Sequence, residues 1–301
     1  SSSVYCIIAN NTCLGNNIGI WLKTESDWSV VDNNTCSENS QAGVYLTFSY
    51  YCMVSNNTCD DNAPNFLGSG ILIDSSQDDT VYNNDCTGNY FGIKLTYSST
   101  DNVLRENELL SNRYGIYAET SSGRNLMDGN TITATSNGIL LDSVVETVIN
   151  NTHISGTQTG IYLAYSDHTV VTNNTISSCL DGLYSYYSDY LMIAFNDISG
   201  NNNNGIGLTD SIGSVVANNT CIGNAQNGIR VDTFQSGFIL NNTFNEAGVG
   251  IYLSSSAGNV VVNNNCSLNT ANPDFNHGIW LFYSSGNTIS NNNCSQNGQH
   301  G

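Results

Sequence analysis

Five charged side chains recur along the chain at a nearly constant spacing, with successive intervals of 23, 23, 22 and 22 residues. They are Asp78, Asp101, Arg124, Glu146 and His168. Carboxylates beside a guanidinium and an imidazole can carry out general acid–base chemistry, and carboxylate oxygens can also hold Ca²⁺. The alternative is a solvated corner where opposite charges offset one another, because exposed ion pairs contribute little to stability.

A second recurring set is aromatic and follows a glycine by two positions. Its members are Trp21, Tyr45, Tyr117, Tyr162, Tyr184, Tyr252 and Trp280. Leu72 and Leu140 take the same position in two other repeats. An outward apolar row of this kind normally marks an interface. Stacked sugar rings could use it, and so could the lateral packing of one copy of the chain against another.

The chain has ten cysteines, which are many for a cytosolic protein, and most share one apolar position of the repeat. Those at this position are Cys13, Cys36, Cys59, Cys86, Cys221, Cys266 and Cys294. They either act as small buried hydrophobic residues or form disulfides between neighbouring repeats. The candidate pairs are Cys13 with Cys36, Cys59 with Cys86, and Cys266 with Cys294. Cα atoms about 4.8 Å apart in stacked strands suit a disulfide, but parallel side chains aim the sulfurs poorly.

A glycine repeat indicates the elements that must position these residues. Nine of its eleven intervals are 22 to 24 residues, and the other two are 27 and 28. The glycines are Gly19, Gly43, Gly70, Gly92, Gly115, Gly138, Gly160, Gly182, Gly205, Gly228, Gly250 and Gly278. A constant period of this size across a whole chain predicts a solenoid of stacked coils.

Apolar residues occupy the first and third positions after most of these glycines, which predicts a strand with one buried face. Two further apolar columns predict two more strands in each coil. An asparagine column, broken by Thr152, suits a corner because each amide can bond the amides above and below it. Its members are Asn11, Asn34, Asn57, Asn84, Asn107, Asn130, Asn174, Asn196, Asn219, Asn242, Asn264 and Asn292. The expected fold is an all-β parallel β-helix of about thirteen coils, forming one domain over residues 1–301.

The repeat resembles a known family. The segments Asn174-Thr175-Ile176 and Gly160-Ile161-Tyr162-Leu163, with Ser166, are similar to the NosD-type, or carbohydrate-binding and sugar-hydrolase (CASH), right-handed parallel β-helix repeat. The resemblance covers essentially the whole chain and implies a right-handed helix in a periplasmic or extracellular protein. Family members include sugar-active enzymes and surface proteins of methanogenic archaea. In lyase-like or polygalacturonase-like helices, a charged column such as the one from Asp78 to His168 would be catalytic.

Composition narrows the partners. The net charge is −19, with only six basic residues, so nucleic acid is a poor partner and an acidic polymer would be repelled unless cations bridge the two. We expect no membrane span, because no stretch is long and apolar enough. The four histidines do not share a column, and we expect no metal centre. The chain lacks an initiator Met and a signal peptide, which is expected of a mature chain or a fragment.

The leading hypothesis is a structural subunit of an extracellular polymer, such as an archaeal sheath, surface layer or filament, and not an enzyme. Copies of the chain would assemble through coil ends and through the aromatic row from Trp21 to Trp280. No cofactor is expected apart from the Ca²⁺ considered above. The alternative is a polysaccharide-binding or polysaccharide-cleaving module, using the aromatic row and the charged column. Envelope polysaccharide is then the partner.

Overall fold

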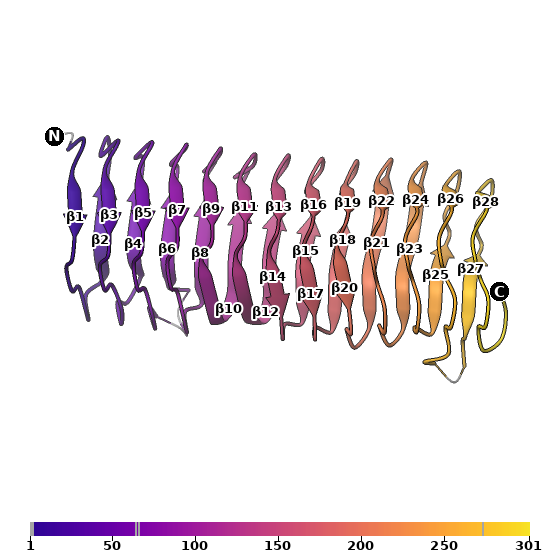
Figure 1. The fold of residues 1–301 in the computed structure, drawn as a ribbon. Coiled ribbons are helices and arrows are strands. Elements are labelled where there is room, and N and C mark those ends of the chain that lie inside the picture. The colour runs from indigo at the N-terminus through magenta and orange to yellow at the C-terminus, as the bar shows by residue number, and fades with distance from the viewer. Residues whose placement is uncertain (1–2, 64, 66, 273) are drawn as a thin grey trace. The chain divides into compact units, whose positions relative to one another are not determined.

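The computed structural model describes residues 3–63, 65, 67–272 and 274–301. Its contacts group the chain into two compact units, Ser1–His153 and Ile154–Gly301, called unit 1 and unit 2 below. In unit 1 short and long strands alternate along the chain, in unit 2 additional short strands follow some of them, and in both units the strands pair in parallel with strands of the neighbouring coil (Figure 1). Each unit is thus a parallel β-helix. The expectation of one domain over residues 1–301 stays a prediction.

In unit 1 the short strands build one sheet and the longer strands a second. The short strands are β1 (Ile7–Ala9), β3 (Val30–Asp32), β5 (Met53–Ser55), β7 (Thr80–Tyr82), β9 (Val103–Arg105), β11 (Leu126–Asp128) and β13 (Val148–Asn150). The long strands are β2 (Ile18–Lys23), β4 (Ala42–Thr47), β6 (Ser69–Asp74), β8 (Phe91–Thr96), β10 (Glu108–Glu119) and β12 (Thr131–Asp142).

Unit 2 repeats this arrangement. The short strands are β16 (Val170–Thr172), β19 (Met192–Ala194), β22 (Val215–Ala217), β24 (Phe238–Leu240), β26 (Val260–Val262) and β28 (Thr288–Ser290). The long strands are β15 (Thr159–Ala164), β18 (Asp181–Tyr186), β21 (Asn204–Ile212), β23 (Asn227–Gln235), β25 (Val249–Ser254) and β27 (His277–Phe282). The remaining short strands are β14 (His153–Ser155), β17 (Thr175–Ser177) and β20 (Asp197–Ser199).

Close approach of backbones explains the glycine repeat. A Cβ atom on Gly43 would lie 2.5 Å from the carbonyl oxygen of Cys36 and 2.7 Å from that of Gly70. Contacts this short cannot be relieved, because both partners are backbone atoms of the same or the next coil. Only glycine lets the long strand begin so close to the neighbouring coil.

The interior of each coil is filled by the three predicted apolar columns. Val31, Val54 and Val81 from successive short strands are fully buried, and the strand registers place them one above another. Ile71 on β6 and Cys59 from the third column are equally buried. The core of each unit is therefore a stack of matched apolar side chains, which is how a solenoid buries its hydrophobic surface.

The asparagine column forms a ladder of buried amides. Asn34 Nδ2 and its backbone N–H both donate to Oδ1 of Asn57, each at 3.0 Å. Asn34 Nδ2 also donates to the carbonyl of Ile8 at 2.9 Å, so the amide is fully paired. The left-handed corner residue is the one before the ladder position, such as Asn33 with φ 53°. The ladder thus satisfies buried backbone groups at the bend.

The third predicted strand of the coil is regular in only some of the coils that the structure describes. In much of unit 1 it is a single bridge pair, such as Thr35 with Thr58, and in the later coils it merges into β10 and β12. Among the described residues, no helix is long and apolar enough to cross a membrane.

Candidate functional site

The charged column lies at turns that precede the short strands. In unit 1, Asp78, Asp101, Arg124 and Glu146 all have left-handed backbone, with φ between 55° and 61°. The guanidinium of Arg124 binds both carboxylate oxygens of Asp101, and this contact lowers the pKa of Asp101. The two groups therefore neutralise each other.

In unit 2 the column continues with His168, also left-handed at φ 56°. Its ring stacks on Tyr190, with centroids 5.1 Å apart and planes at 8°. Within the described residues, no group of three or more His, Cys, Asp or Glu side chains could hold a metal ion. A catalytic role for the column, and the Ca²⁺ considered with it, stay predictions.

All ten cysteines are free thiols in this structure. Cys36, Cys59, Cys86, Cys221 and Cys266 are buried in the interior, whereas Cys13 and Cys294 are half-buried. Thiol hydrogen bonds link neighbours of the ladder, and one to Cys59, together with burial, raises the pKa of Cys36. The cysteines thus pack as small hydrophobic residues here, and the three proposed disulfides stay predictions for oxidising conditions.

Asp79 is a buried acid that was not predicted as a site from the sequence. Its backbone N–H donates to Asn102, and its Oδ1 accepts the N–H of Cys52 at 2.7 Å. Its Oδ2 is buried without a hydrogen-bond partner, and burial raises the pKa of this carboxyl to about 8. At the next rung, Asn102 Nδ2 donates to the carbonyl of Ser76 at 3.3 Å. Asp79 thus replaces an amide in an internal ladder, and we assign it a structural position.

In unit 1 the predicted aromatic row lies on the outer face of the long-strand sheet. Strand registers align Trp21 with Tyr45 and, further along the same row, Lys94 with Tyr117. The rings of Trp21 and Tyr45 stack with centroids 5.5 Å apart and planes at 2°. The rings therefore pile up along the stacking direction, so neighbouring members of the row cover each other's faces.

Around Lys94 the outer face of unit 1 is closed by its own contacts. The ammonium lies 4.9 Å from the centroid of Phe91 and 2.8 Å from Glu119. The hydroxyl of Tyr117 donates to the same carboxylate at 2.8 Å. Burial opposes ionisation of Glu119, but the hydrogen bonds from Lys94 and Tyr117 prevail and lower its pKa. These polar groups bind one another.

In unit 2 the same row contains a glycine, whereas the non-aromatic members in unit 1 are Leu72, Lys94 and Leu140. The registers give the order Tyr162, Tyr184, Gly207, Arg230, Tyr252, Trp280. Tyr162 and Tyr184 stack at 5.6 Å, and Tyr252 and Trp280 lie 4.9 Å apart. Between the two aromatic pairs stand one glycine and one arginine. Arg230 lies over the ring of Tyr252 at 5.5 Å and binds Asp232 through Nε at 2.7 Å.

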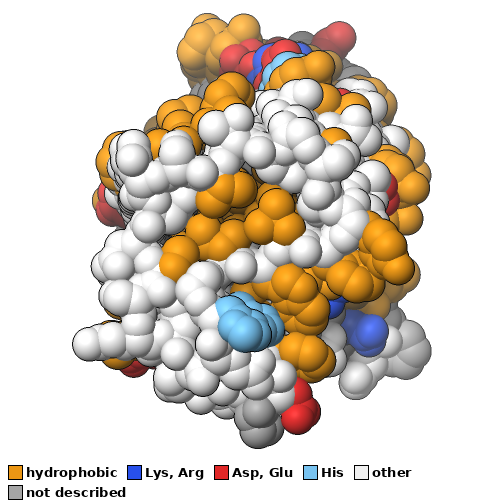
Figure 2. Space-filling model, turned by 90° about the vertical axis from the view of Figure 1, so that its right-hand side faces the viewer, with side chains coloured by type: hydrophobic (Ala, Val, Ile, Leu, Met, Phe, Trp, Pro, Cys, Tyr) orange, Lys and Arg blue, Asp and Glu red, His pale blue; other side chains and the backbone are white. Residues whose placement is uncertain are grey.

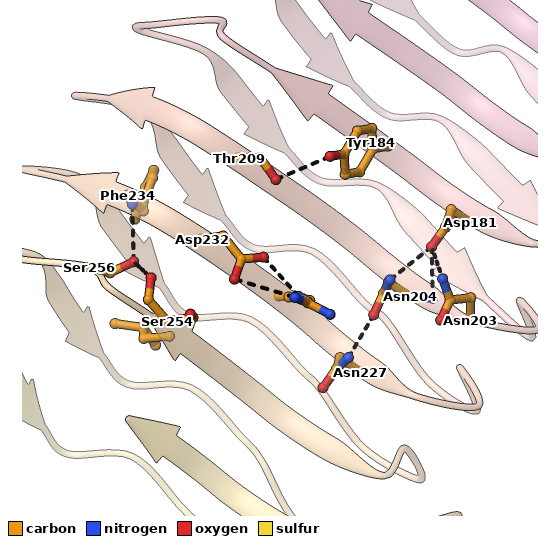
Figure 3. Close-up of polar contacts among 12 residues, drawn as sticks. Asp181, Tyr184, Asn203, Asn204, Thr209, Asn227, Asp232, Phe234, Ser254 and Ser256 are labelled. Atoms are coloured by element: carbon orange, nitrogen blue, oxygen red, sulfur yellow. Dashed lines mark hydrogen bonds and ion pairs between the residues drawn. The ribbon is translucent and has the colours of Figure 1, made fainter. Parts of the chain in front are cut away.

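A carboxylate with an amide cluster borders this interruption (Figure 3). Oδ1 of Asp181 accepts hydrogen bonds from Asn203 Nδ2 at 2.8 Å and from Asn204 Nδ2 at 2.9 Å. Asn227 Nδ2 in turn donates to Asn204 Oδ1 at 2.7 Å. On the opposite side, the hydroxyl of Tyr184 bonds that of Thr209 at 3.2 Å. These contacts hold a polar rim in place beside the gap at Gly207.

Two pockets flank Arg230. The first, of about 290 Å³, is lined by Asp181, Tyr184, Asn203, Asn204, Gly207, Arg230 and Asp232. The second, of about 240 Å³, is lined by Gln226, Asn227, Arg230, Val249, Tyr252, Asn272, Phe275 and Trp280. Each combines an aromatic wall with a few polar groups, which is the usual make-up of a small-molecule site. We take this pair of pockets as the candidate site.

Two other hollows are less suited to this role. One, of about 460 Å³ in unit 1, is lined by Asn, Thr, Asp and Glu side chains and no aromatic ring. The other, of about 450 Å³, lies on the last coil of unit 2, where hydrophobic side chains gather in the middle of the face (Figure 2). There Ile289 is exposed, although Val261 at the same position one coil earlier is buried. This hollow is therefore lined by core positions of the repeat.

The family model for the right-handed β-helix region matches residues 1–143 and 137–294. The chain belongs to the right-handed β-helix family. The predicted fold class, an all-β right-handed parallel β-helix, is confirmed. A comparison with curated proteins found none that matches the chain.

Several solved β-helices share this fold. The periplasmic alginate epimerase AlgG has a TM-score of 0.71 and 16% identity, with 94% of this chain and 77% of that chain covered. The A-module of mannuronan C-5 epimerase AlgE6 from Azotobacter vinelandii has 0.69 and 13%, covering 98% and 91%. A hyperthermoactive exopolygalacturonase from Thermotoga maritima has 0.57 and 9%, covering 86% and 80%. Identities this low show the fold alone.

These neighbours are polysaccharide-acting β-helix proteins by name. Since likeness at this level shows the fold alone, these neighbours do not decide between the structural subunit and the polysaccharide alternative, and the sheath hypothesis finds no support among them. They also do not single out the NosD-type repeat or an archaeal source. The row from Trp21 to Trp280 was predicted from the sequence, whereas Gly207, Arg230 and Asp232 were not. The available signal was Gly207, the row position without a side chain, because Leu72 and Lys94 also replace aromatic residues in two successive repeats of unit 1.

Proposed function

We propose that unit 2 binds a neutral polysaccharide on the outer face of its long-strand sheet. The observation that supports this most is the pair of pockets on either side of Arg230, one walled by Tyr184 and the other by Tyr252 and Trp280. Aromatic rings offer apolar surface to the flat side of a sugar, while amide, carboxylate and guanidinium groups bind its hydroxyls.

The order of the pockets follows the stacking direction of the coils. Tyr184 lies on β18, Arg230 on β23 and Trp280 on β27. A linear glycan would therefore cross the strands and place one sugar on each side of Arg230. The guanidinium uses two of its five N–H donors on Asp232, at 2.7 and 3.4 Å, which leaves donors for hydroxyls of either sugar.

Charge favours a neutral glycan. The net charge of −19 would repel a polyanion at long range, and Asp181 and Asp232 stand at the site itself. Carboxylates are good acceptors for sugar hydroxyls but poor neighbours for uronic acids. By analogy with its structural neighbours, we place the protein outside the cytoplasm. Assembly of copies into a sheath or filament has no comparison to support it.

The test is calorimetric titration of the full chain with neutral hexasaccharides (cellohexaose, xylohexaose and mannohexaose), with polygalacturonate as the acidic control. We expect at least one neutral ligand to bind, and Trp280→Ala to weaken binding at least about tenfold, as removal of an aromatic anchor does. The matched control is Trp21→Ala, which removes a tryptophan from the same row in unit 1. Equal losses in both variants, or binding of polygalacturonate alone, would contradict the proposal.

A further inference from the structure

Gly207 leaves a rung of the unit 2 row without a side chain. Registers place it between Tyr184 and Arg230, and strands in a sheet are about 4.8 Å apart. The ring of Tyr184 leans over the glycine, because a Cβ atom there would lie 2.8 Å from Tyr184 Cδ2. Its hydroxyl, bonded to Thr209 at 3.2 Å, holds the ring in this position.

The two faces of Tyr184 differ for this reason. β15 lies on one side of β18 and β21 on the other. One face of the ring is therefore covered by Tyr162, at 5.6 Å, and the other is turned toward the empty rung. Elsewhere in the row such a face would be covered by the next side chain, as the stacked pair Trp21 and Tyr45 shows.

Polar groups surround the empty rung on the other sides. Asn203 and Asp181 line one end of the pocket of about 290 Å³, and Arg230 and Asp232 line the other. Asn203 Oδ1 is buried without a hydrogen-bond partner in the described structure. A buried acceptor left unpaired is costly, so a ligand hydroxyl that donates to it would gain more than an ordinary surface contact.

We infer that the space above Gly207 binds one neutral pyranose ring, which takes the place of the missing rung. The flat face of the sugar stacks on Tyr184, and its hydroxyls reach Asn203 and Asp181 on one edge and Arg230 and Asp232 on the other. The volume of about 290 Å³ is near the lower limit of about 300 Å³ for ligand pockets, which suits a small ligand such as a single sugar ring. This inference rests on the proposed function and assigns its specificity-determining subsite.

Filling the rung tests the inference. Gly207→Leu introduces a side chain that the row already holds as Leu72 and Leu140 in unit 1, so the fold has a precedent for it. We expect the best neutral hexasaccharide to bind at least about tenfold more weakly. The ring of Tyr184 must shift to admit the new side chain, because a Cβ atom at position 207 would lie 2.8 Å from its Cδ2, so the melting temperature should fall somewhat. The matched control is Leu72→Gly, which empties a rung in unit 1 and should leave binding as it was.

Two further measurements separate the outcomes. Methyl glucoside, methyl xyloside and methyl mannoside are titrated against wild type, Gly207→Leu and Asn203→Ala, with saturation-transfer NMR as the readout. We expect weak binding of a monosaccharide that both variants abolish. Wild-type hexasaccharide affinity in Gly207→Leu, with a loss in Trp280→Ala, would overturn the subsite and leave the proposed function standing. No hexasaccharide binding by the wild type would overturn both.

Discussion

Two regions of the outward row differ. Around Lys94 in unit 1 the side chains bind one another, and we call this region the closed face. Around Arg230 in unit 2 the row borders two pockets, and we call this region the open face. Lys94 and its partner Glu119 are 22% and 27% exposed, whereas Arg230 and Asp232 are 45% and 24% exposed. Lys94 is followed by Tyr117, which covers it and bonds its partner. On the neighbouring strand, Gly207 stands beside Arg230 and has no side chain to cover it. One missing side chain leaves the cation and a ring face accessible.

An outward aromatic row is not by itself a binding surface. Rings in register stack on one another, as Trp21 does on Tyr45, and this uses the faces that a ligand would need. An interruption supplies what the row lacks, because it exposes a ring face and admits polar neighbours. On this view the closed face contributes to stability and the open face to binding.

We expect the greatest change in stability from substituting Asp79, an acid in the interior of unit 1. Asp79 in unit 1 and Asn259 in unit 2 are each the residue before a short strand. Burial raises the pKa of Asp79 to about 8 in the folded state, above the value of about 3.9 expected when unfolded. The folded protein therefore holds a proton between these values, and stability falls as pH rises from about 4 to 8.

Asp79→Asn should abolish this dependence and stabilise the protein at pH 8 by several kcal/mol, at most about 1.4 kcal/mol for each pH unit between the two pKa values. The matched variant is Asn259→Asp, since Asn259 Nδ2 donates to the carbonyl of Phe234 at 2.9 Å and a carboxylate would face that oxygen. It should destabilise the protein increasingly as pH rises. Urea unfolding between pH 5 and 9 measures both, and equal slopes in all three proteins would refute the account.

The next effect separates the two tyrosines of the row. Tyr117→Ala removes ring stacking on Phe91 at 5.1 Å and the hydrogen bond to Glu119, and should cost about 2 kcal/mol of unfolding free energy. Tyr184→Ala should weaken hexasaccharide binding about tenfold or more. Denaturant unfolding and calorimetry on both variants check this. The distinction fails if Tyr117→Ala impairs binding as much as Tyr184→Ala does.

The last prediction replaces each of the two cations, Lys94 and Arg230, with methionine, a neutral side chain of similar length. We expect its effects to be smaller than those above. Lys94→Met removes an ion pair that is largely shielded and should cost about 1 kcal/mol of stability. It should also raise the pKa of Glu119, which NMR titration can follow, because a hydrogen bond from Lys94 helps to lower it. Arg230→Met should leave stability nearly unchanged and weaken glycan binding several-fold. The opposite pattern would show that the closed and open faces have been assigned the wrong way round.

Much of the fold could be predicted from the sequence because each coil repeats the same local demands. Glycine is required at Gly43 because a Cβ atom there would lie 2.5 and 2.7 Å from two carbonyl oxygens, and a similar close approach recurs at other glycines of the repeat, such as Gly92 and Gly205. The inward columns and the asparagine ladder follow for the same reason. The third apolar column predicts a strand in each coil, whereas in much of unit 1 this strand is a single bridge pair.

Only part of the candidate site could be predicted from the sequence. The row from Trp21 to Trp280 was predicted as an outward interface, and this role stays a prediction. Gly207 and Arg230 were not predicted, because they are not aromatic. The charged column from Asp78 to His168 was a catalytic candidate because of its residue types. In the structure its arginine, Arg124, is paired with Asp101 at a turn. Residue types identified candidates, and contacts between coils distinguished them.

The amino-acid sequence by itself determined the coil, the inward and outward faces and the stacking of like residues, because these follow from a period that every repeat obeys. Only the tertiary structure decided which outward residues satisfy one another and which remain open to a ligand. Ring orientation, the lean of Tyr184 over Gly207 and the paired donors of Arg230 depend on packing between neighbouring coils. A deviation in one repeat acquires meaning only from the coils on either side of it.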